Sequence, residues 1–133
     1  MSGTLTHLEC SFCGETQPAD QLITTCPSCG KVLVARYDLD AASRTMTPEA
    51  IRERAWDMWR YAEILPVLDP VNRVSLGEGA TPLLDTPRLG GEIGLNRLSV
   101  KDEGQNPTGS FKARGLAMAV SRAKELGAEA LVI

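Results

Sequence analysis

Four cysteines within twenty residues constrain this chain more than any other feature of its sequence. They form two pairs, Cys10-x2-Cys13 and Cys26-x2-Cys29, separated by twelve residues. A glycine follows each pair and lets the backbone turn back, so that its amides can point at the sulfurs. Two such turns that face each other place four sulfurs at the corners of a tetrahedron, the arrangement of an all-thiolate structural Zn²⁺ site. We therefore predict a small zinc-ribbon-like module, stabilised by metal because it is too short to bury a core.

Two other uses of the cysteines stay open, namely a pair of disulfides and an iron–sulfur or redox site. The first residues, 1–9, have no basic region followed by an apolar core, so we expect no secretory signal and a cytoplasmic chain. A reducing compartment argues against disulfides. A redox Cys-x-x-Cys accounts for one pair but not for two. Because a four-cysteine site has no open position, we expect the zinc to be structural and not catalytic.

Composition excludes several classes of protein. The 133 residues are 43% hydrophobic and 23% charged, an ordinary globular balance for about one domain. A net charge of −3 argues against a nucleic-acid partner. The longest apolar run, residues 116–120, is too short to span a membrane. The single histidine, His7, lies near the N-terminus and makes a histidine-based catalytic triad a poor hypothesis.

Three regions follow one another along the chain. Residues 1–37 hold the cysteines and a β-branched run, 31–37, that predicts a strand. Residues 38–95 begin with a predicted amphipathic helix, capped by Thr47 and ended by Pro66. The rest of this region, 66–95, is so rich in glycine and proline that we expect an irregular connection.

The third region, residues 96–133, has the pattern of a strand, a loop, a helix and a strand. We expect a strand over 97–101, a polar loop over 102–109, a helix over 110–126 and a second strand over 130–133. Such a unit is the repeating piece of a parallel sheet with flanking helices. The predicted fold class is therefore α/β with an incomplete parallel sheet, because one unit cannot form a stable sheet alone.

The loop before the predicted helix carries the most chemical information. Gly104-x4-Gly109 has the spacing of a P-loop, but Ser110 stands where that motif needs lysine. Lys112 instead lies in the first turn of the helix, where the helix N-terminus and the neighbouring Phe111 disfavour a positive charge. Both effects favour a neutral, nucleophilic amine suited to Schiff-base chemistry. The alternative is a solvated lysine on a helix face. We interpret residues 101–103 mainly as the polar end of the strand expected over 97–101.

Residues 106–115 (NPTGSFKARG) resemble the lysine motif of the tryptophan-synthase-β-like family of pyridoxal-phosphate enzymes, which have fold type II. Two further segments, 75–83 (SLGEGATPL) and 58–66 (MWRYAEILP), are similar to segments of the threonine synthase branch of that family. The cysteine pairs also occur at the N-terminus of some members of this branch. The resemblance covers essentially the whole chain in the correct order.

The resemblance implies that Lys112 holds pyridoxal 5′-phosphate covalently and that Phe111 packs against one face of the cofactor ring. Asn106 and Ser110 would shape the loop, and residues 77–81 would border the substrate entrance or form a simple turn. The implied reaction of this carbon–oxygen lyase converts O-phospho-L-homoserine and water to L-threonine and phosphate, in a homo-oligomer when full length. A dehydratase, a cysteate synthase and a non-catalytic zinc-ribbon binding module remain as alternatives.

Family members carry two further loops, a Ser-Gly-Asn-type loop and a Gly-rich loop that grips the cofactor phosphate. Neither loop occurs in residues 1–133. We therefore expect the chain to be an N-terminal fragment that is inactive alone. The apolar residues 131–133 then correspond to a strand that is cut short.

Overall fold

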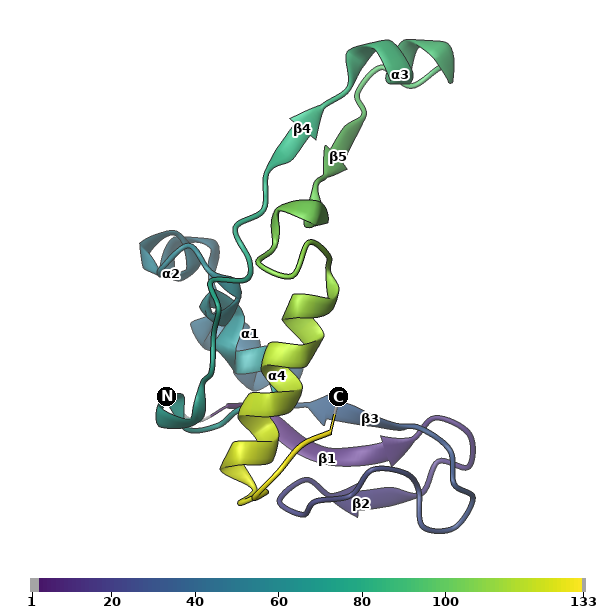
Figure 1. Ribbon diagram of the computed structural model, residues 1–133, viewed down its shortest axis with the longest axis vertical. Coiled ribbons are helices and arrows are strands. Elements are labelled where there is room, and N and C mark those ends of the chain that lie inside the picture. The colour runs from purple at the N-terminus through teal and green to yellow at the C-terminus, as the bar shows by residue number, and fades with distance from the viewer. Residues whose placement is uncertain (1–2, 133) are drawn as a thin grey trace.

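The computed structural model describes residues 3–132. Short strands and helices follow one another along the chain (Figure 1). In order they are β1 (Leu5–Cys10), β2 (Thr16–Pro18), β3 (Leu33–Tyr37), α1 (Leu39–Thr45), α2 (Pro48–Glu53), the 3-10 segments η1 (Met58–Ile64) and η2 (Pro70–Asn72), β4 (Leu83–Asp85), α3 (Pro87–Glu92), β5 (Ser99–Lys101), η3 (Glu103–Gln105) and α4 (Lys112–Glu125). No helix among the described residues has both the length and the apolar character needed to cross a membrane.

The first sheet is built by the cysteine-bearing part of the chain. Its strand order is β2-β1-β3, and both pairs are antiparallel. Leu8 of the central strand lies opposite Gln17 on one side and Ala35 on the other. The strand predicted over 31–37 is confirmed as β3. This sheet fixes the position of Cys10, the last residue of β1.

The helix predicted from Thr47 to Pro66 starts as expected but is wrong in its length. The Thr47 hydroxyl accepts a hydrogen bond from the Ala50 N–H, and Pro48 occupies the first turn. α2 then ends at Glu53, and η1 begins only after Asp57, whose carboxylate accepts from the Trp59 N–H. Aspartate competes for backbone donors in this way, and it interrupts a helix that hydrophobic periodicity alone predicts to be continuous.

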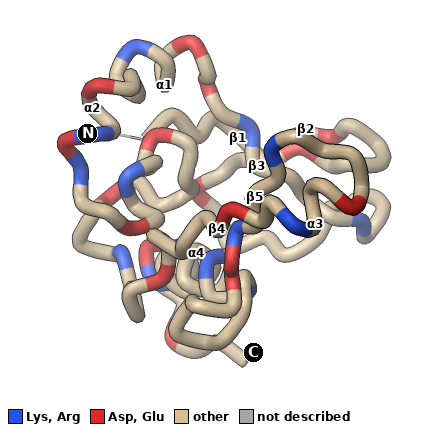
Figure 2. Tube along the Cα trace, turned by 90° about the horizontal axis from the view of Figure 1, so that it is seen from above, with Lys and Arg blue, Asp and Glu red and all other residues tan. Residues whose placement is uncertain are grey.

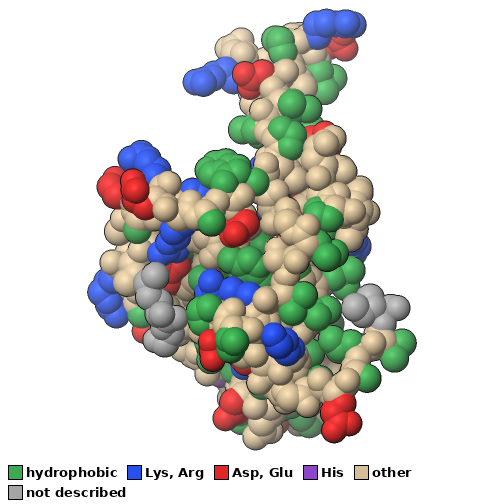
Figure 3. All heavy atoms as spheres, turned by 60° about the vertical axis from the view of Figure 1, so that its left-hand side comes forward, with side chains coloured by type: hydrophobic (Ala, Val, Ile, Leu, Met, Phe, Trp, Pro, Cys, Tyr) green, Lys and Arg blue, Asp and Glu red, His purple; other side chains and the backbone are tan. Residues whose placement is uncertain are grey.

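The prediction of an irregular connection over 66–95 agrees with residues 66–82 apart from the short segment η2, but it is wrong for residues 83–92. β4 pairs antiparallel with β5, with Leu84 opposite Val100, and α3 lies between the two strands. Figure 1 shows these elements as an arm that projects away from the rest of the molecule. All residues of β4 and β5 are exposed, and hydrophobic side chains are visible on the arm in Figure 3. β4 is stabilised by its pairing with β5, in which Leu84 and Val100 are sixteen positions apart. The local glycine and proline content therefore does not predict β4.

The third region agrees with the sequence in its helix and first strand. β5 lies within the predicted strand 97–101, and α4 lies within the predicted helix 110–126. Gly127, with φ at +76°, ends the helix as expected. Of the second predicted strand, residues 130–132 are not in a strand, and residue 133 lies outside the described residues. Because both sheets within residues 3–132 are antiparallel, the parallel sheet remains a prediction for longer chains.

Helix α4 connects parts of the chain that are far apart in sequence. Near its C-terminal end, Arg122 donates a hydrogen bond of 2.6 Å to the carbonyl of Ala19 in the cysteine-bearing part. The Glu125 carboxylate accepts from the backbone N–H groups of Leu68 and Asp69. A small core of Met58, Trp59 and Val67 packs against the middle of the same helix, at Ala117 and Met118.

Along the chain trace, acidic and basic residues are interleaved (Figure 2).

Gly79 offers a test of how closely residues 77–81 pack against η1. Its φ is +106°, and a Cβ added there would lie 2.5 Å from the backbone nitrogen of Met58. We expect Gly79→Ala to lower the free energy of unfolding by about 2 kcal/mol or more, measured by urea denaturation. Gly115→Ala is the matched control, because a Cβ there meets nothing within 4 Å and alanine favours a helix by about 1 kcal/mol. Equal stability of Gly79→Ala and the unchanged chain would show that this close approach does not exist.

Candidate functional site

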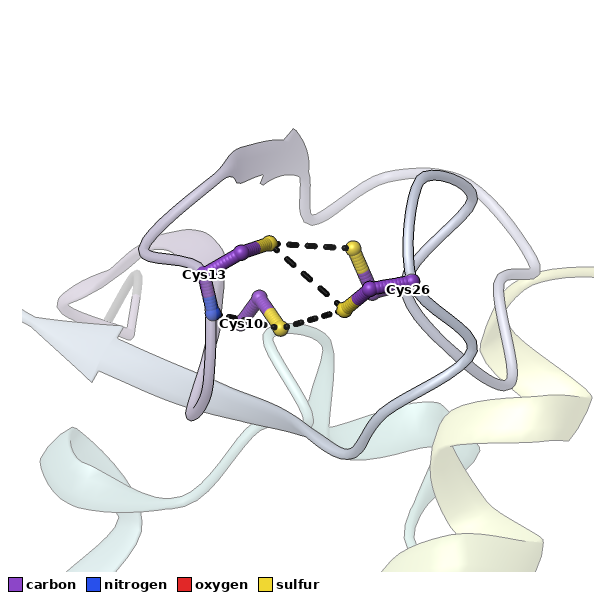
Figure 4. Close-up of side chains that lie close together, drawn as sticks. Cys10, Cys13 and Cys26 are labelled. Atoms are coloured by element: carbon purple, nitrogen blue, oxygen red, sulfur yellow. Dashed lines mark hydrogen bonds between the residues drawn. The ribbon is translucent and has the colours of Figure 1, made fainter.

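The two cysteine pairs lie on two similar turns. Gly14 and Gly30 follow the second cysteine of each pair and have φ values of +75° and +70°, as the sequence predicts. Their N–H groups donate to the carbonyls of Cys10 and Cys26, at 3.1 and 2.8 Å. Only glycine adopts this left-handed conformation without strain, so both turns depend on it. The turns face each other, with the sulfurs of Cys10 and Cys13 directed toward the turn of Cys26 (Figure 4).

The four sulfurs form a compact group. All four Sγ atoms lie within 4.8 Å of one another. Three of the separations are 3.5 Å for Cys10–Cys29, 3.7 Å for Cys13–Cys26 and 3.6 Å for Cys13–Cys29. A tetrahedral Zn²⁺ with Zn–S bonds of about 2.3 Å requires sulfurs about 3.8 Å apart. The spacing therefore fits a tetrahedral metal and exceeds the roughly 2 Å of a disulfide bond.

His7 contacts the Thr6 hydroxyl, and its other ring nitrogen lies 3.9 Å from Glu9.

The surroundings of the sulfurs also suit a cation. The N–H groups of Cys13 and Phe12 donate to the Cys10 sulfur and lower its pKa to about 6. At Cys29 the Lys31 N–H acts in the same direction, but burial and the three neighbouring sulfurs outweigh it and raise the pKa to about 12. Four thiolates at this distance repel one another, so a cation is needed to hold all of them ionised.

Lys112 and Phe111 lie together at the start of α4. Lys112 is the first residue of the helix, and its Nζ lies 4.9 Å from the centroid of the Phe111 ring. The phenyl ring is 60% exposed, and the lysine side chain is exposed as well. Among the described residues, no carboxylate oxygen lies within 4.0 Å of this amine. The amine is therefore accessible and is not held in an ion pair, which fits a lysine that reacts with an aldehyde.

Beside this lysine lies a polar cluster that the sequence interpretation missed. Arg114 donates from Nε to Glu103 Oε2 at 2.6 Å and from Nη2 to Glu103 Oε1 at 2.8 Å. The Thr81 hydroxyl donates to Oε1 at 2.5 Å, and Asn106 Nδ2 donates to Oε2 at 3.0 Å. We call Thr81, Glu103, Asn106 and Arg114 the Glu103 hub. Glu103 is thus more than the polar end of a strand, because it accepts from Thr81 and Arg114 on two other segments as well as from Asn106 on its own.

The Glu103 hub fixes the surroundings of Lys112. Asn106 Oδ1 accepts from the Gly79 N–H at 3.2 Å, so residues 77–81 are bound to the loop before α4. Arg114 lies only two residues after the lysine, so its ion pair holds the first turn of the helix to the same loop. Thr81 and Arg114 both belong to the motif segments noted above. Their membership in these motifs was the one available signal that they act together.

A pH titration tests the strength of the Glu103 hub. The hydrogen bond and charge of Arg114, with the hydrogen bond from Thr81, lower the pKa of Glu103 from 4.5 to about 2. A lowered folded-state pKa means that the stabilisation is complete above about pH 4.5 and is lost as the pH falls through about 2. We expect the ¹⁵Nε resonance of Arg114 to titrate with a midpoint near 2. Glu103→Gln should remove this titration, and a midpoint near 4.5 in the unchanged chain would show that the pair is not formed.

Comparison with known proteins gives one family and a consistent set of relatives. Residues 74–133 match the family described as pyridoxal-phosphate dependent enzyme. The chain is 47% identical over 120 residues to a threonine synthase of Methanocaldococcus jannaschii, and 42% identical over 122 residues to one of Methanosarcina acetivorans. These alignments cover 90% and 91% of the chain but 29% of each relative. A Synechocystis threonine synthase is 51% identical over 73 residues, 54% of the chain and 19% of that protein. The chain therefore spans less than a third of the length of these relatives.

Proposed function

We propose that this chain forms the N-terminal part of a threonine synthase, because residues 74–133 match the family of pyridoxal-phosphate dependent enzymes and nine-tenths of the chain aligns with threonine synthases. The observation that carries this proposal is the identity of 47% across both the cysteine-bearing part and the lysine loop. The position of Lys112 supports it, since an exposed amine at a helix start follows the loop that the family motif predicts.

The proposed reaction converts O-phospho-L-homoserine and water to L-threonine and phosphate. Pyridoxal phosphate, when bound, supplies an electron sink for the carbanion character that develops on the substrate. Lys112 would hold the cofactor through its ε-amino group and would move protons at Cα and Cβ of the substrate as a general acid and base. Phe111 would pack against the cofactor ring, and its exposed phenyl group beside the Lys112 amine supports this role.

The second part of the proposal is a structural zinc ion bound by Cys10, Cys13, Cys26 and Cys29. Its support is the spacing of the four sulfurs and the two glycine turns that present them. Four protein ligands leave no coordination position for a substrate, so the metal would stabilise the fold of residues 5–37 and take no part in the reaction.

Reductive labelling tests the cofactor assignment. The full-length protein, incubated with pyridoxal phosphate and reduced with borohydride, should carry a pyridoxyl group on the peptide that contains Lys112, identified by mass spectrometry. A visible absorption band should be present before reduction and absent after it. A protein with no band and no adduct would instead be a non-catalytic zinc-ribbon binding module.

Product analysis separates threonine synthase from other enzymes of the family. The full-length protein should release phosphate and L-threonine from O-phospho-L-homoserine in equal amounts. Formation of a 2-oxo acid from threonine, with no product from the phosphorylated substrate, would identify a dehydratase. Formation of cysteate from O-phosphoserine and sulfite would identify a cysteate synthase.

A further inference from the structure

We propose that a pocket beside η1 and η2 binds a free α-amino acid with an apolar side chain, a ligand that the proposed reaction does not assign to it. The pocket has a volume of about 310 Å³, at the lower end of small-molecule sites. Residues before, within and just after η1 line it together with Gly3, Pro70 and Arg73. We call it the Arg73 pocket. It shares no residue with the lysine motif 106–115 or with the Glu103 hub.

The wall of the Arg73 pocket is largely apolar. Its apolar lining residues are Ala55, Trp59, Ala62, Val67 and Pro70. Trp59 and Val67 also belong to the small core that packs against α4, so this part of the wall is held in place by the fold. A small pocket with such a wall suits a ligand that has an apolar body and few polar groups.

Two of the four charged residues in the pocket neutralise each other. Arg54 donates from Nη2 to Glu63 Oε1 at 2.5 Å and from Nη1 to Glu63 Oε2 at 2.7 Å. These hydrogen bonds lower the pKa of Glu63 to about 2. Both carboxylate oxygens and both terminal nitrogens are used within the pair. Arg54 and Glu63 therefore add no net charge to the pocket.

The other two charged residues, Arg73 and Asp57, are half-buried and have no ion-pair partner among residues 3–132. The Arg73 guanidinium carbon lies 5.3 Å from the centroid of the Trp59 ring, beside the apolar wall. Its Nε is buried, and within the same residues its Nη1 and Nη2 have no hydrogen-bond acceptor. The Asp57 carboxylate accepts from the Trp59 N–H at 2.8 Å and meets no cation within 4.0 Å in this part of the chain.

These groups together indicate the class of ligand. The two Nη nitrogens of Arg73 can donate to both oxygens of one carboxylate. The Asp57 carboxylate can accept from an ammonium group. A simple anion would pair with Arg73 but be repelled by Asp57, and a simple cation would meet the opposite problem. A molecule with a carboxylate, an ammonium group and an apolar body satisfies all three features, and this is an α-amino acid with an apolar side chain.

Fluorine NMR of the full-length protein tests the Arg73 pocket. The protein is labelled with fluorotryptophan, loaded with zinc and freed of pyridoxal phosphate. It is then titrated with L-leucine, which is neither the substrate nor the product of the proposed reaction. We expect the resonance of Trp59, assigned with Trp59→Phe, to shift saturably. The resonance of Trp56 is the internal control, because Trp56 is close in sequence but does not line the pocket.

Two analogues and two substitutions separate the roles of the charges. Isocaproate lacks the ammonium group of leucine, isoamylamine lacks its carboxylate, and each should bind at least about tenfold more weakly. Arg73→Gln should weaken leucine binding about tenfold and leave isoamylamine binding unchanged. Asp57→Asn should weaken leucine binding and leave isocaproate binding unchanged, because asparagine keeps an acceptor for the Trp59 N–H. Arg88→Gln is the matched control, since Arg88 is exposed on α3 and does not line the pocket.

Each outcome of these titrations decides the proposal. A Trp59 resonance that does not shift saturably would overturn it, as would a leucine affinity that either Arg73→Gln or Asp57→Asn leaves unchanged. Isocaproate that binds as tightly as leucine would identify a carboxylate site instead. If Arg73→Gln fails to fold by circular dichroism, the two analogues and Asp57→Asn still decide. Because the protein carries no pyridoxal phosphate in these experiments, the proposed enzymatic function is not at stake in any of them.

Discussion

Lys112→Ala is expected to abolish both cofactor attachment and turnover in the full-length enzyme. Lys112 is the only lysine in residues 106–115, the loop and first turn of α4, and its side chain is exposed. A lost general acid and base costs a factor of about 10² to 10⁴ in rate, and loss of covalent attachment adds to it. We therefore expect kcat to fall by at least about 10³-fold, with no borohydride-stable adduct.

Lys124→Ala is the control for this substitution, because Lys124 lies in the last turn of the same helix and donates to the Val71 carbonyl. It should retain the adduct and a normal rate. Added methylamine should restore part of the activity of Lys112→Ala if the missing group acts in proton transfer. A Lys112→Ala enzyme that keeps its visible band after washing would refute the assignment of this lysine.

Removal of the proposed zinc ion is expected to unfold the cysteine-bearing part of the chain. Cys10 and Cys26 are the buried hydrophobic residues there, and the strands around them are only half-buried. Apparent free energies of structural zinc binding are about 10–16 kcal/mol, as large as the whole stability of an ordinary domain. Cys26→Ser or a strong chelator should therefore collapse the amide resonance dispersion of residues 5–37 in ¹H–¹⁵N spectra.

Metal analysis and a neighbouring substitution complete this test. The reduced chain should contain one zinc per molecule by plasma mass spectrometry, and Ser28→Ala, on the same turn but without a ligand atom, should keep both the metal and the spectrum. A freshly purified, reduced chain that is folded over residues 5–37 and contains no metal would contradict the zinc proposal. Iron in place of zinc, with visible charge-transfer bands, would identify the iron–sulfur alternative.

The parts of the fold that the sequence predicted are those with local causes. The turns of Cys10 and Cys26 depend on the glycines beside them, and the end of α4 depends on Gly127. Thr47 and Pro48 mark the start of α2 for the same reason. In each case a residue acts on its own backbone or on that of its neighbours, so a short window of sequence contains the whole signal.

The parts that sequence reasoning missed depend on distant partners. β4 exists because β5 pairs with it, and the break between α2 and η1 is accompanied by an Asp57 cap and by contact between Met58 and Glu78. The Glu103 hub has the same character, since Glu103 and Thr81 are 22 positions apart. Hydrophobic periodicity and local propensity contain no information about such pairings, so sequence reasoning proposes Lys112 but does not reveal the residues of the Glu103 hub.

The contact between Arg122 and Ala19 has a consequence for the order of events during synthesis. The cysteine-bearing part is complete once residue 37 has been made, and its strands pair only with one another. Arg122, its contact on α4, lies 103 residues after Ala19 in the chain. At a translation rate of about 5–20 residues per second, at least several seconds separate the two. Uptake of the proposed zinc ion can therefore precede docking, and the nascent chain would carry a folded N-terminal module before the helix that anchors it has emerged.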